Sequence, residues 1–422
     1  MENVGRRTKL TCADLFAGAG GLSVGFHLSG FDSLFFNEID PQAAQTFRSN
    51  FPKAAPFVGP IEQLSARHIC DESRLDGNSI DVVLGGPPCQ GFSINAPVRS
   101  GTDPRNHLFR HYVRLVLEGL RPKFIVMENV PGLVSLDGGR TLRDVCLSFE
   151  KAGYRVVFKI LNAAHYGVPQ ERWRLVFLGT RLPGIELSLP APMHHSNQRP
   201  NFTGGREFTF RHAIGKQDQI GLFDDPLLPP TTVSEAIGDL PPIESGGGTP
   251  VMKYTRTPQG PFQSLLREGS SELYNHQSAD LAPINLQRLR YVKPGGSWRD
   301  IPHDLLPRGL QRARRSDHTR RYGRLDPISL SCTILTKCDP HWGTFFHYNQ
   351  DRVISVREAA RLQSFPDWFH FTGSVSDQYR QVGNAVPPLL ALALAEHIKN
   401  LLRKAKSPPS EGAKEDRHYA AS

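Results

Sequence analysis

Apolar residues in the first 180 positions of the chain form short runs separated by stretches of mixed character. Val, Ile, Leu and Phe dominate these runs, which is typical of buried strands. The runs lie at residues 10–16, 32–38, 80–86, 123–129, 154–160 and 173–179. Helical spacing of apolar positions lies between them, at residues 41–50, 106–119 and 139–151. This alternation predicts an α/β fold with a doubly wound, mostly parallel sheet covered by helices on both faces.

The pattern changes after this first part of the chain. Between residues 186 and 350, segments rich in proline and glycine, such as DDPLLPP and LPPIESGGGTP, interrupt every periodicity and predict a smaller, loop-rich domain. An amphipathic pattern returns near residue 355 and predicts helices that pack on the core of the first domain. We expect a first domain at residues 1–185 completed by 351–402, a second domain inserted at 186–350, and a disordered tail at 403–422.

The positive charge of the chain is concentrated in the predicted insert. The 422 residues have a net charge of +9, and residues 286–324 alone contain eleven basic side chains against three acidic ones. Aromatic and histidine side chains interleave with them, namely Trp298, His303, His318 and Tyr322. Arginine and aromatic side chains together can bind phosphates and the edges of bases. We therefore expect this segment to bind nucleic acid and not to be only a solvent-exposed charged surface.

Cysteine usage and hydropathy exclude several other classes of protein. The six cysteines have no short paired spacing, which argues against a disulfide framework and a zinc cluster, so we expect no metal and a reducing cytoplasm. The amino-terminal stretch is polar, and no run of about 18 apolar residues occurs, so we expect neither a secretory signal nor a membrane span.

A glycine-rich turn follows the first predicted strand and precedes a helix. It contains Gly18, Gly20 and Gly21, whose backbone amides can face a polar ligand group. Glu38 ends the second predicted strand about 20 residues later, where a carboxylate can accept both hydroxyls of a ribose. The pair predicts a nucleoside cofactor, although turn geometry alone would also explain the glycines. The spacing departs from the NAD fingerprint and leaves S-adenosylmethionine as a candidate.

Two further strands end in residues with reactive side chains. The strand at residues 80–86 leads through a Gly-Gly-Pro-Pro turn to Cys89, and the strand at 123–129 delivers Glu128 to the same expected edge of the sheet. Ligands bind at this edge in open α/β folds. Most cysteines are inert, but one in a rigid turn at such an edge is better suited to be a nucleophile.

Six ordered motifs resemble those of the DNA (cytosine-5) methyltransferase family, of the bacterial modification-methylase type. They are DLFAGAGGLSVGF, GGPPCQGFS, MENVPGL, NAAHYGVPQERWRLVFLG, SVREAARLQSFPD and QVGNAVPP. The resemblance implies a methyltransferase fold that uses S-adenosylmethionine, with residues 186–350 as the target recognition domain. It also implies that duplex DNA is the substrate and that the target cytosine is flipped out of the helix.

The resemblance assigns roles to particular side chains. Cys89 is the thiolate that adds to cytosine C6, which makes C5 nucleophilic, and Glu128 assists at N3. Arg172 and Arg174 contact the target nucleotide and the loop that contains Cys89, whereas Gln170 is interpreted as structural. Residues implied to bind the cofactor are Phe16, Gly18, Gly20, Gly21, Glu38, Ile39, Pro87, Asn384 and Val386. An alternative for Arg172 or Arg174, taken singly, is that it only pairs with an acid at the edge of a strand.

Two positions depart from the family pattern, both on the adenine side of the expected cofactor site. Pro60 occupies the position where many members have an acid that binds the adenine amino group, so that contact is absent or is made by a neighbour such as Glu62. Ile39 stands where some members have an aromatic ring, and it can still pack on the adenine face. Neither change affects the methyl-transfer step.

Three alternatives remain for the function. A transfer RNA cytosine-5 methyltransferase would use the same chemistry, but that branch lacks a large insert and has a Cys-Phe-Thr element that this chain does not contain. A DNA-binding regulator with a vestigial enzyme core would have no use for Cys89, Glu128 and both arginines together. An NAD-dependent dehydrogenase would leave the cysteine and glutamate motifs unexplained.

The biological setting predicted by the resemblance is a bacterial restriction-modification system in the cytoplasm. We expect a monomer, because each DNA strand is modified independently and the reaction needs no two-fold symmetry. A cognate restriction endonuclease would share the target site without binding this protein directly.

Overall fold

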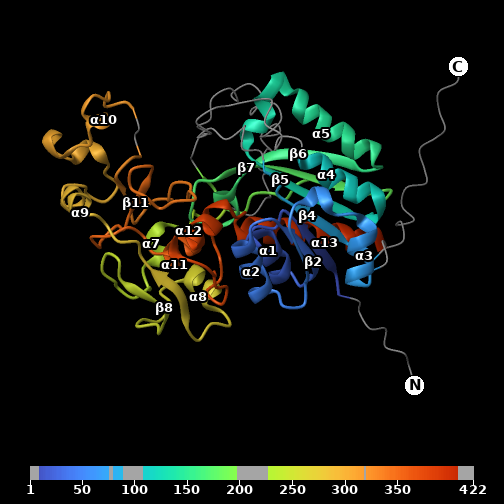
Figure 1. The fold of residues 1–422 in the computed structure, drawn as a ribbon, viewed down its shortest axis with the longest axis horizontal. Coiled ribbons are helices and arrows are strands. Elements are labelled where there is room, and N and C mark those ends of the chain that lie inside the picture. Colours follow the sequence, from blue (N-terminus) through green and yellow to red (C-terminus); the bar gives the residue numbers. More distant parts are fainter. Residues whose placement is uncertain (1–8, 76–78, 89–107, 197–226, 318–319, 407–422) are drawn as a thin grey trace, which may run out of the picture.

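A seven-stranded sheet forms the centre of the first half of the molecule (Figure 1). The computed structural model describes residues 9–75, 79–88, 108–196, 227–317 and 320–406. The spatial order of the strands is β3-β2-β1-β4-β5-β7-β6. Their bounds are β1 Thr11–Leu15, β2 Asp32–Glu38, β3 Ala55–Val58, β4 Val82–Gly85, β5 Phe124–Asn129, β6 Arg155–Asn162 and β7 Trp173–Thr180.

The sheet is mixed but mostly parallel, as the sequence predicts. Neighbouring strands run parallel from β3 across to β5, whereas β7 runs antiparallel to both β5 and β6. Strand order reverses between β1 and β4, and a crevice opens beyond the carboxyl ends of strands at such a point. The short strand β3 is absent from the sequence prediction, because its four residues include Pro56 and show no clear apolar run.

Helices cover both faces of the sheet, because alternate residues of the central strands are apolar on opposite sides. Val82 and Leu84 pack with one helical layer, whereas Val83 between them packs with the other. The layer on the Val82 side contains α1 Gly21–Leu28 and α13 Pro388–Lys406. The layer on the Val83 side contains α3 Ala66–Ser73, α4 Leu108–Leu115 and α5 Arg140–Lys151. The carboxyl-terminal helix α13 thus completes the first core, as the sequence predicts.

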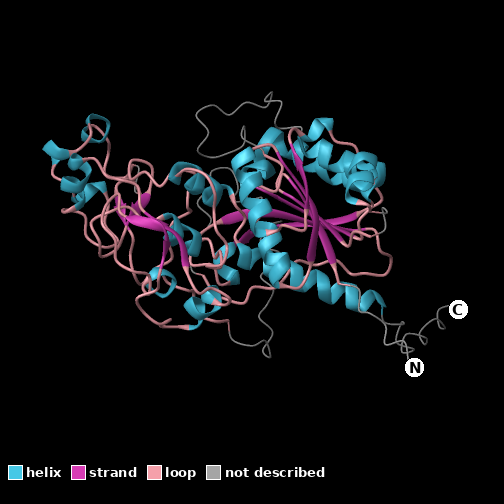
Figure 2. Cartoon of the chain, turned by 60° about the horizontal axis from the view of Figure 1, so that its bottom comes forward, coloured by secondary structure: helices cyan, strands magenta, loops and turns pink. Residues whose placement is uncertain are grey.

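Loops dominate the second part of the molecule, which lies beside the sheet (Figure 2). Two small two-stranded sheets occur there among the described residues. Its elements are α7 Val233–Ile237, β8 Gly248–Met252, α8 Pro261–Arg267, β9 Leu273–Gln277, α9 Pro283–Leu289, α10 Arg308–Gln311, β10 Gly323–Arg324 and β11 Thr344–Phe346. It shares a hydrophobic core with α2 Pro41–Asn50, α11 Val356–Leu362 and α12 Val375–Asn384.

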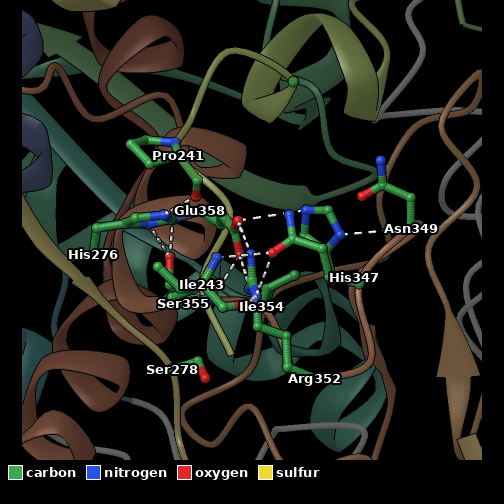
Figure 3. Close-up of polar contacts among 12 residues, drawn as sticks. Pro241, Ile243, His276, Ser278, His347, Asn349, Arg352, Ile354, Ser355 and Glu358 are labelled. Carbon is green, nitrogen blue, oxygen red and sulfur yellow. Dashed lines mark hydrogen bonds and ion pairs between the residues drawn. The ribbon is translucent and has the colours of Figure 1, made fainter. Parts of the chain in front are cut away.

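A buried polar network holds α11 against the second part of the chain (Figure 3). Arg352 donates two hydrogen bonds of 2.7 Å to the Glu358 carboxylate, and both side chains are almost fully buried. His347 contacts the same carboxylate through Nε2 at 3.4 Å. His276 lies between the Ser355 hydroxyl and the Pro241 carbonyl, 2.8 Å from each. These contacts fix the start of α11, whose seven residues are all buried.

A helix that spans a bilayer needs about 20 consecutive, mostly apolar residues. Among the described residues, no helix combines sufficient length with sufficient apolar character.

Candidate active site

The carboxyl ends of β1, β4 and β5 lie side by side and bring together the segments that the sequence singled out. Leu15 of β1 pairs with Gly85 of β4, and Gly85 in turn pairs with Met127 of β5. The glycine-rich turn, the Gly-Gly-Pro-Pro turn and Glu128 therefore share one edge of the sheet. This edge is the place where the strand order reverses.

The turn after β1 is held against the end of β2 by Glu38. The Glu38 carboxylate accepts hydrogen bonds from the Gly18 amide at 2.7 Å and from the Asp40 amide at 2.8 Å. Burial raises the pKa of Glu38, and the two amide hydrogen bonds oppose this shift. Phe16 adopts the left-handed conformation with φ of 57°, which is uncommon for a residue with a side chain. The structure thus brings Phe16, Gly18 and Glu38 together.

The glycines of this turn serve different purposes. A Cβ at Gly21 would lie 2.3 Å from the Val386 carbonyl oxygen, so this glycine permits the close approach of α1 to the segment before α13. Gly20 has φ of 101° and precedes α1. A Cβ at Gly18 would meet nothing within 4 Å, so open space adjoins this position. Of the three, Gly18 is the one beside room for a ligand.

Asp14, the first residue of the DLFAGAGGLSVGF motif, is a buried acid at this edge to which the sequence assigns no role. Its Oδ2 accepts a hydrogen bond of 2.8 Å from the Ser23 hydroxyl, whereas its Oδ1 is buried without a partner. Burial raises the pKa of Asp14 to about 7, with a further contribution from the negative charge of Glu38. A buried acceptor without a donor is costly unless a ligand supplies one. Asp14 and Glu38 together suit a ligand that has cationic and hydroxyl groups.

Exposed apolar side chains adjoin Glu38. Ile39 is 65% exposed and Val58, which pairs with Glu38 across β2 and β3, is 50% exposed. Pro60 precedes a short 3-10 helix, Ile61–Gln63, on which Glu62 is exposed. A flat aromatic ring could cover Ile39 and Val58, which would remove both from water. The proline itself offers no side-chain acceptor.

Cys89 lies outside the described residues, but the turn that leads to it is described. Pro87 is buried, and its carbonyl accepts a hydrogen bond of 3.1 Å from the Asn129 side chain. A Cβ at Gly86 would lie 3.5 Å from the Glu128 carboxylate. The Gly-Gly-Pro-Pro turn therefore passes directly against Glu128 and Asn129 at the end of β5.

Four cysteines among the described residues are not activated. Burial raises the pKa of Cys12 to about 12 and that of Cys146 to about 11, and it also raises the pKa of Cys332 and Cys338. A thiol with a raised pKa is a poor nucleophile at neutral pH, because the reactive form is the thiolate.

Glu128 forms an ion pair with Arg174 across two antiparallel strands. Arg174 Nε lies 2.7 Å from Glu128 Oε1, and the two side chains are largely buried. Burial raises the pKa of Glu128, while the charges of Arg174 and Arg172 oppose the shift. A carboxyl with a raised pKa retains its proton to higher pH than an exposed glutamate does, so Glu128 is suited to donate a hydrogen bond.

Arg172 is placed differently from Arg174. Its guanidinium is buried and donates to the carbonyls of Ile334, Gly383 and Ala385, at distances of 2.8–3.1 Å. It therefore joins β7 to the second part of the chain and to the carboxyl end of α12. Asn384, the last residue of α12, is exposed, and Val386 in the turn that follows is buried beside Gly21. These contacts fix the position of the guanidinium, and the contact of Arg172 with the target nucleotide stays a prediction.

Gln170 and Glu171 connect the same edge to the second part of the chain. Gln170 is buried and bonded to Leu362, Gln363 and Ile334, in agreement with its interpretation as structural. Glu171 Oε2 lies 2.8 Å from Arg320 Nη2. No sequence signal reveals this contact, because the two residues are 149 positions apart. It brings the basic segment to the catalytic edge.

No group of three or more metal-ligating side chains could hold a metal ion within the part of the chain that the structure describes. The polar groups at the edge are instead backbone amides, which donate hydrogen bonds, and carboxylates, which accept them, and both suit an organic ligand.

Comparisons with known proteins show similarity over most of the chain. The profile of the family described as C-5 cytosine-specific DNA methylase matches residues 10–400. The type II methyltransferase M1.HphI of Haemophilus parahaemolyticus is 36% identical over 92% of this chain and 86% of that protein. The type II methyltransferase M.AgeI of Thalassovita gelatinovora is 35% identical over 92% of this chain and 98% of that protein.

The fold is also similar to a solved structure. A prophage-encoded DNA modification methyltransferase (E. coli) superposes with a TM-score of 0.68 and 26% sequence identity. The similarity covers 93% of this chain and 99% of that one.

Proposed function

The chain belongs to the C-5 cytosine-specific DNA methylase family, and from this premise we propose how its residues perform the reaction. It is a DNA (cytosine-5)-methyltransferase, most similar to the methyltransferases of type II restriction-modification systems. The descriptions of the family and of the similar solved structure name DNA, so the transfer RNA alternative and the dehydrogenase alternative are set aside.

The first proposal concerns the methyl donor, S-adenosylmethionine. Its ribose hydroxyls suit Glu38, its adenine suits the exposed faces of Ile39 and Val58, and its cationic end suits the unpartnered oxygen of Asp14. Phe16, Pro87, Asn384 and Val386 would complete the site. When bound, S-adenosylmethionine supplies the methyl group that cytosine C5 receives.

The second proposal assigns the reacting groups. The Cys89 thiolate forms a bond to cytosine C6, and Glu128 provides the proton that electron flow toward N3 requires. Arg174 holds the Glu128 carboxyl at the edge of the sheet, where it meets the flipped base. After methylation, loss of the C5 proton to solvent, departure of the Cys89 thiolate and return of the N3 proton to Glu128 restore the aromatic ring. Arg172 holds the surrounding segments together, and with Arg174 it contacts the target nucleotide and the loop that contains Cys89.

The position of one ion pair is the main support for these reacting groups. The Glu128–Arg174 pair, with its 2.7 Å contact and its raised glutamate pKa, lies directly against the turn that leads to Cys89. A paired acid at the end of a strand, next to the turn that carries a cysteine, is the arrangement that addition of a thiolate to a protonated pyrimidine requires.

The covalent step can be tested with duplex DNA in which 5-fluorodeoxycytidine replaces deoxycytidine. Fluorine at C5 cannot leave as a cation, so the protein–DNA adduct should persist in denaturing gels when S-adenosylmethionine is present. Peptide mass analysis should locate the adduct at Cys89. An adduct at another cysteine, or persistent failure to form one on DNA that the enzyme methylates, would contradict the assignment.

The remaining proposals concern the setting. We place residues 186–350 as the target recognition domain and the enzyme as the modification arm of a restriction-modification system in the bacterial cytoplasm. A cognate endonuclease would recognise the same site without binding this chain. We further propose that the enzyme acts as a monomer, and sedimentation velocity that gave a dimer in the absence of DNA would contradict this.

A further inference from the structure

The basic side chains between residues 286 and 324 fall into two groups according to their partners. One group consists of exposed cations whose side chains make no hydrogen bond or ion pair within the described ranges. Its members are Arg290, Lys293, Arg308, Arg312, Arg314 and Arg315. Such free side chains can follow phosphates, which requires charge but no fixed orientation. Arg321 belongs to the other group, whose side chains are held in place.

Arg321 lies over the ring of an exposed tryptophan. Its Cζ is 5.2 Å from the centre of the Trp342 ring, within the range of a cation–π contact. Trp342 is 56% exposed, and its other neighbour is the His341 ring, which meets it edge-on at 4.9 Å. The Arg321 side chain makes no hydrogen bond or ion pair within the described part of the chain. A cation–π contact holds the guanidinium without using its N–H groups, which stay free to donate.

The backbone on both sides of this pair is held rigidly. The Tyr322 amide donates to the Pro340 carbonyl at 2.6 Å, and its hydroxyl lies 3.3 Å from His341 Nδ1. Strand β10 then pairs with β11, two residues beyond Trp342. Tyr322 itself is buried and has φ of 49°, a conformation that persists only where the surroundings impose it. The backbone at residues 320–324 and 340–346, which we call the platform, therefore holds the Arg321–Trp342 pair in place.

The platform adjoins the catalytic edge. Arg320, the residue before Arg321, makes the 2.8 Å ion pair with Glu171. Glu171 precedes Arg172 and lies three residues from Arg174, which holds Glu128. Glu171 is bonded to the second part of the chain through its backbone as well, to Ser331 and Thr333. A duplex whose cytosine reaches this edge thus passes close to Arg321.

A guanidinium held over an aromatic ring, with its N–H groups free to donate, matches the O6 and N7 acceptors of guanine in the major groove. We propose that Arg321, held by Trp342, reads a guanine in the recognition sequence. This inference rests on the proposed function only in that duplex DNA is the ligand. Trp342 acts as a positioning residue, because its ring holds the guanidinium.

The test is selection of bound sequences from a random duplex pool by the whole protein, without methyl transfer. The wild-type protein should enrich a motif that contains guanine at one position. In Arg321→Lys, which retains the charge but not the planar fork, preference for that guanine should fall about ten- to a hundredfold, with the other positions unchanged. Trp342→Ala should weaken the same preference, and Trp342→Phe should restore part of it.

Arg312→Ala is the matched control, because Arg312 is exposed and has no partner within the described residues. It should lower affinity for every sequence equally and leave the motif intact. If Arg321→Lys keeps the wild-type motif, or if Arg321→Ala loses affinity uniformly as the control does, Arg321 contacts phosphate and the inference is wrong. Methylation of the enriched motif is measured separately, so a wild-type protein that selects a motif without methylating it would contradict the proposed function alone.

Discussion

Among single residues, Glu128 makes the reaction rate depend on pH through its proton. Burial raises its pKa, so the protonated form extends above the usual carboxylate range. Because only this form donates to cytosine N3, we predict that the single-turnover rate falls as pH rises through the raised pKa. Glu128→Gln keeps the shape of the side chain but cannot transfer a proton, and it should lose a factor of about 10²–10⁴ in rate. A variant that kept both the rate and the pH profile would exclude this role.

The nucleophile gives a second prediction at this scale. Cys89→Ser should abolish turnover, because a serine hydroxyl is far less nucleophilic than a thiolate. Binding of S-adenosylmethionine, measured by calorimetry, should remain close to that of the wild-type protein. Cys146→Ser is the control, since Cys146 lies on α5 and burial raises its pKa. Turnover by Cys89→Ser at the rate of this control would contradict the covalent mechanism.

Motifs predict the candidate reacting residues but not the contacts that position them. Glu128 lies at the end of one strand and Cys89 follows another, and the apolar runs of both strands are visible in the sequence, so the expected topology assigns the two residues to one edge. The partners of Arg172 lie 162–213 positions away in the chain, and no local pattern encodes such contacts. Gly21 is similar, because the approach of Val386 that requires a glycine exists only in the folded chain.

Among the helices, α11 is held between the two parts of the chain by the buried Arg352–Glu358 ion pair. We predict that Glu358→Gln destabilises the protein by about 3–5 kcal/mol, because Arg352 would be left buried without its counter-charge. Urea unfolding measures the change. Asp71→Asn is the control, since the Arg67–Asp71 pair is exposed and should contribute about 1 kcal/mol or less. Equal effects of the two variants would show that the buried pair has no special role.

The same network predicts how stability changes with pH. Burial lowers the pKa of His347 to about 4, whereas an unfolded histidine titrates near 6.5. Between these values the unfolded state binds the additional proton, so the contribution of His347 makes the free energy of unfolding fall as pH decreases from about 6.5 to about 4. His347→Gln should flatten this part of the curve, measured by urea unfolding at each pH. An unchanged slope would mean that His347 is not buried in solution as it is here.

The elements themselves are unevenly predictable from the sequence. Six of the seven strands of the main sheet follow from apolar runs, and α13 follows from its long amphipathic pattern. Strand β3 does not, because hydrogen bonding to β2, and not its own four residues, makes it a strand. The short helices and strands between residues 233 and 346 are predicted only as loops, because tertiary packing holds them in place. The core shared with α2 and α11 holds α7 and β9, and a separate cluster holds α9 and α10.

At the scale of the whole molecule, the charge distribution predicts a strong dependence of DNA binding on salt. Neutralising Arg312, Arg314 and Arg315 together should reduce the slope of log K against log salt by about 0.9 for each phosphate that these side chains neutralise in the wild-type protein. Arg67→Ala is the control, because Arg67 is exposed on α3, at the opposite end of the molecule from α10 (Figure 1). If the triple variant and the control have the same slope, the basic segment is only a solvated face.

Transfer of methyl groups to C5 of cytosine in duplex DNA can be measured directly. The protein is incubated with methyl-labelled S-adenosylmethionine and either mixed-sequence duplex DNA or transfer RNA, and the label in each nucleoside is determined. We predict label in 5-methyldeoxycytidine from the DNA, confined to one sequence context, and none in the RNA. Label in transfer RNA alone, or in N4-methylcytosine or N6-methyladenine instead, would contradict the account.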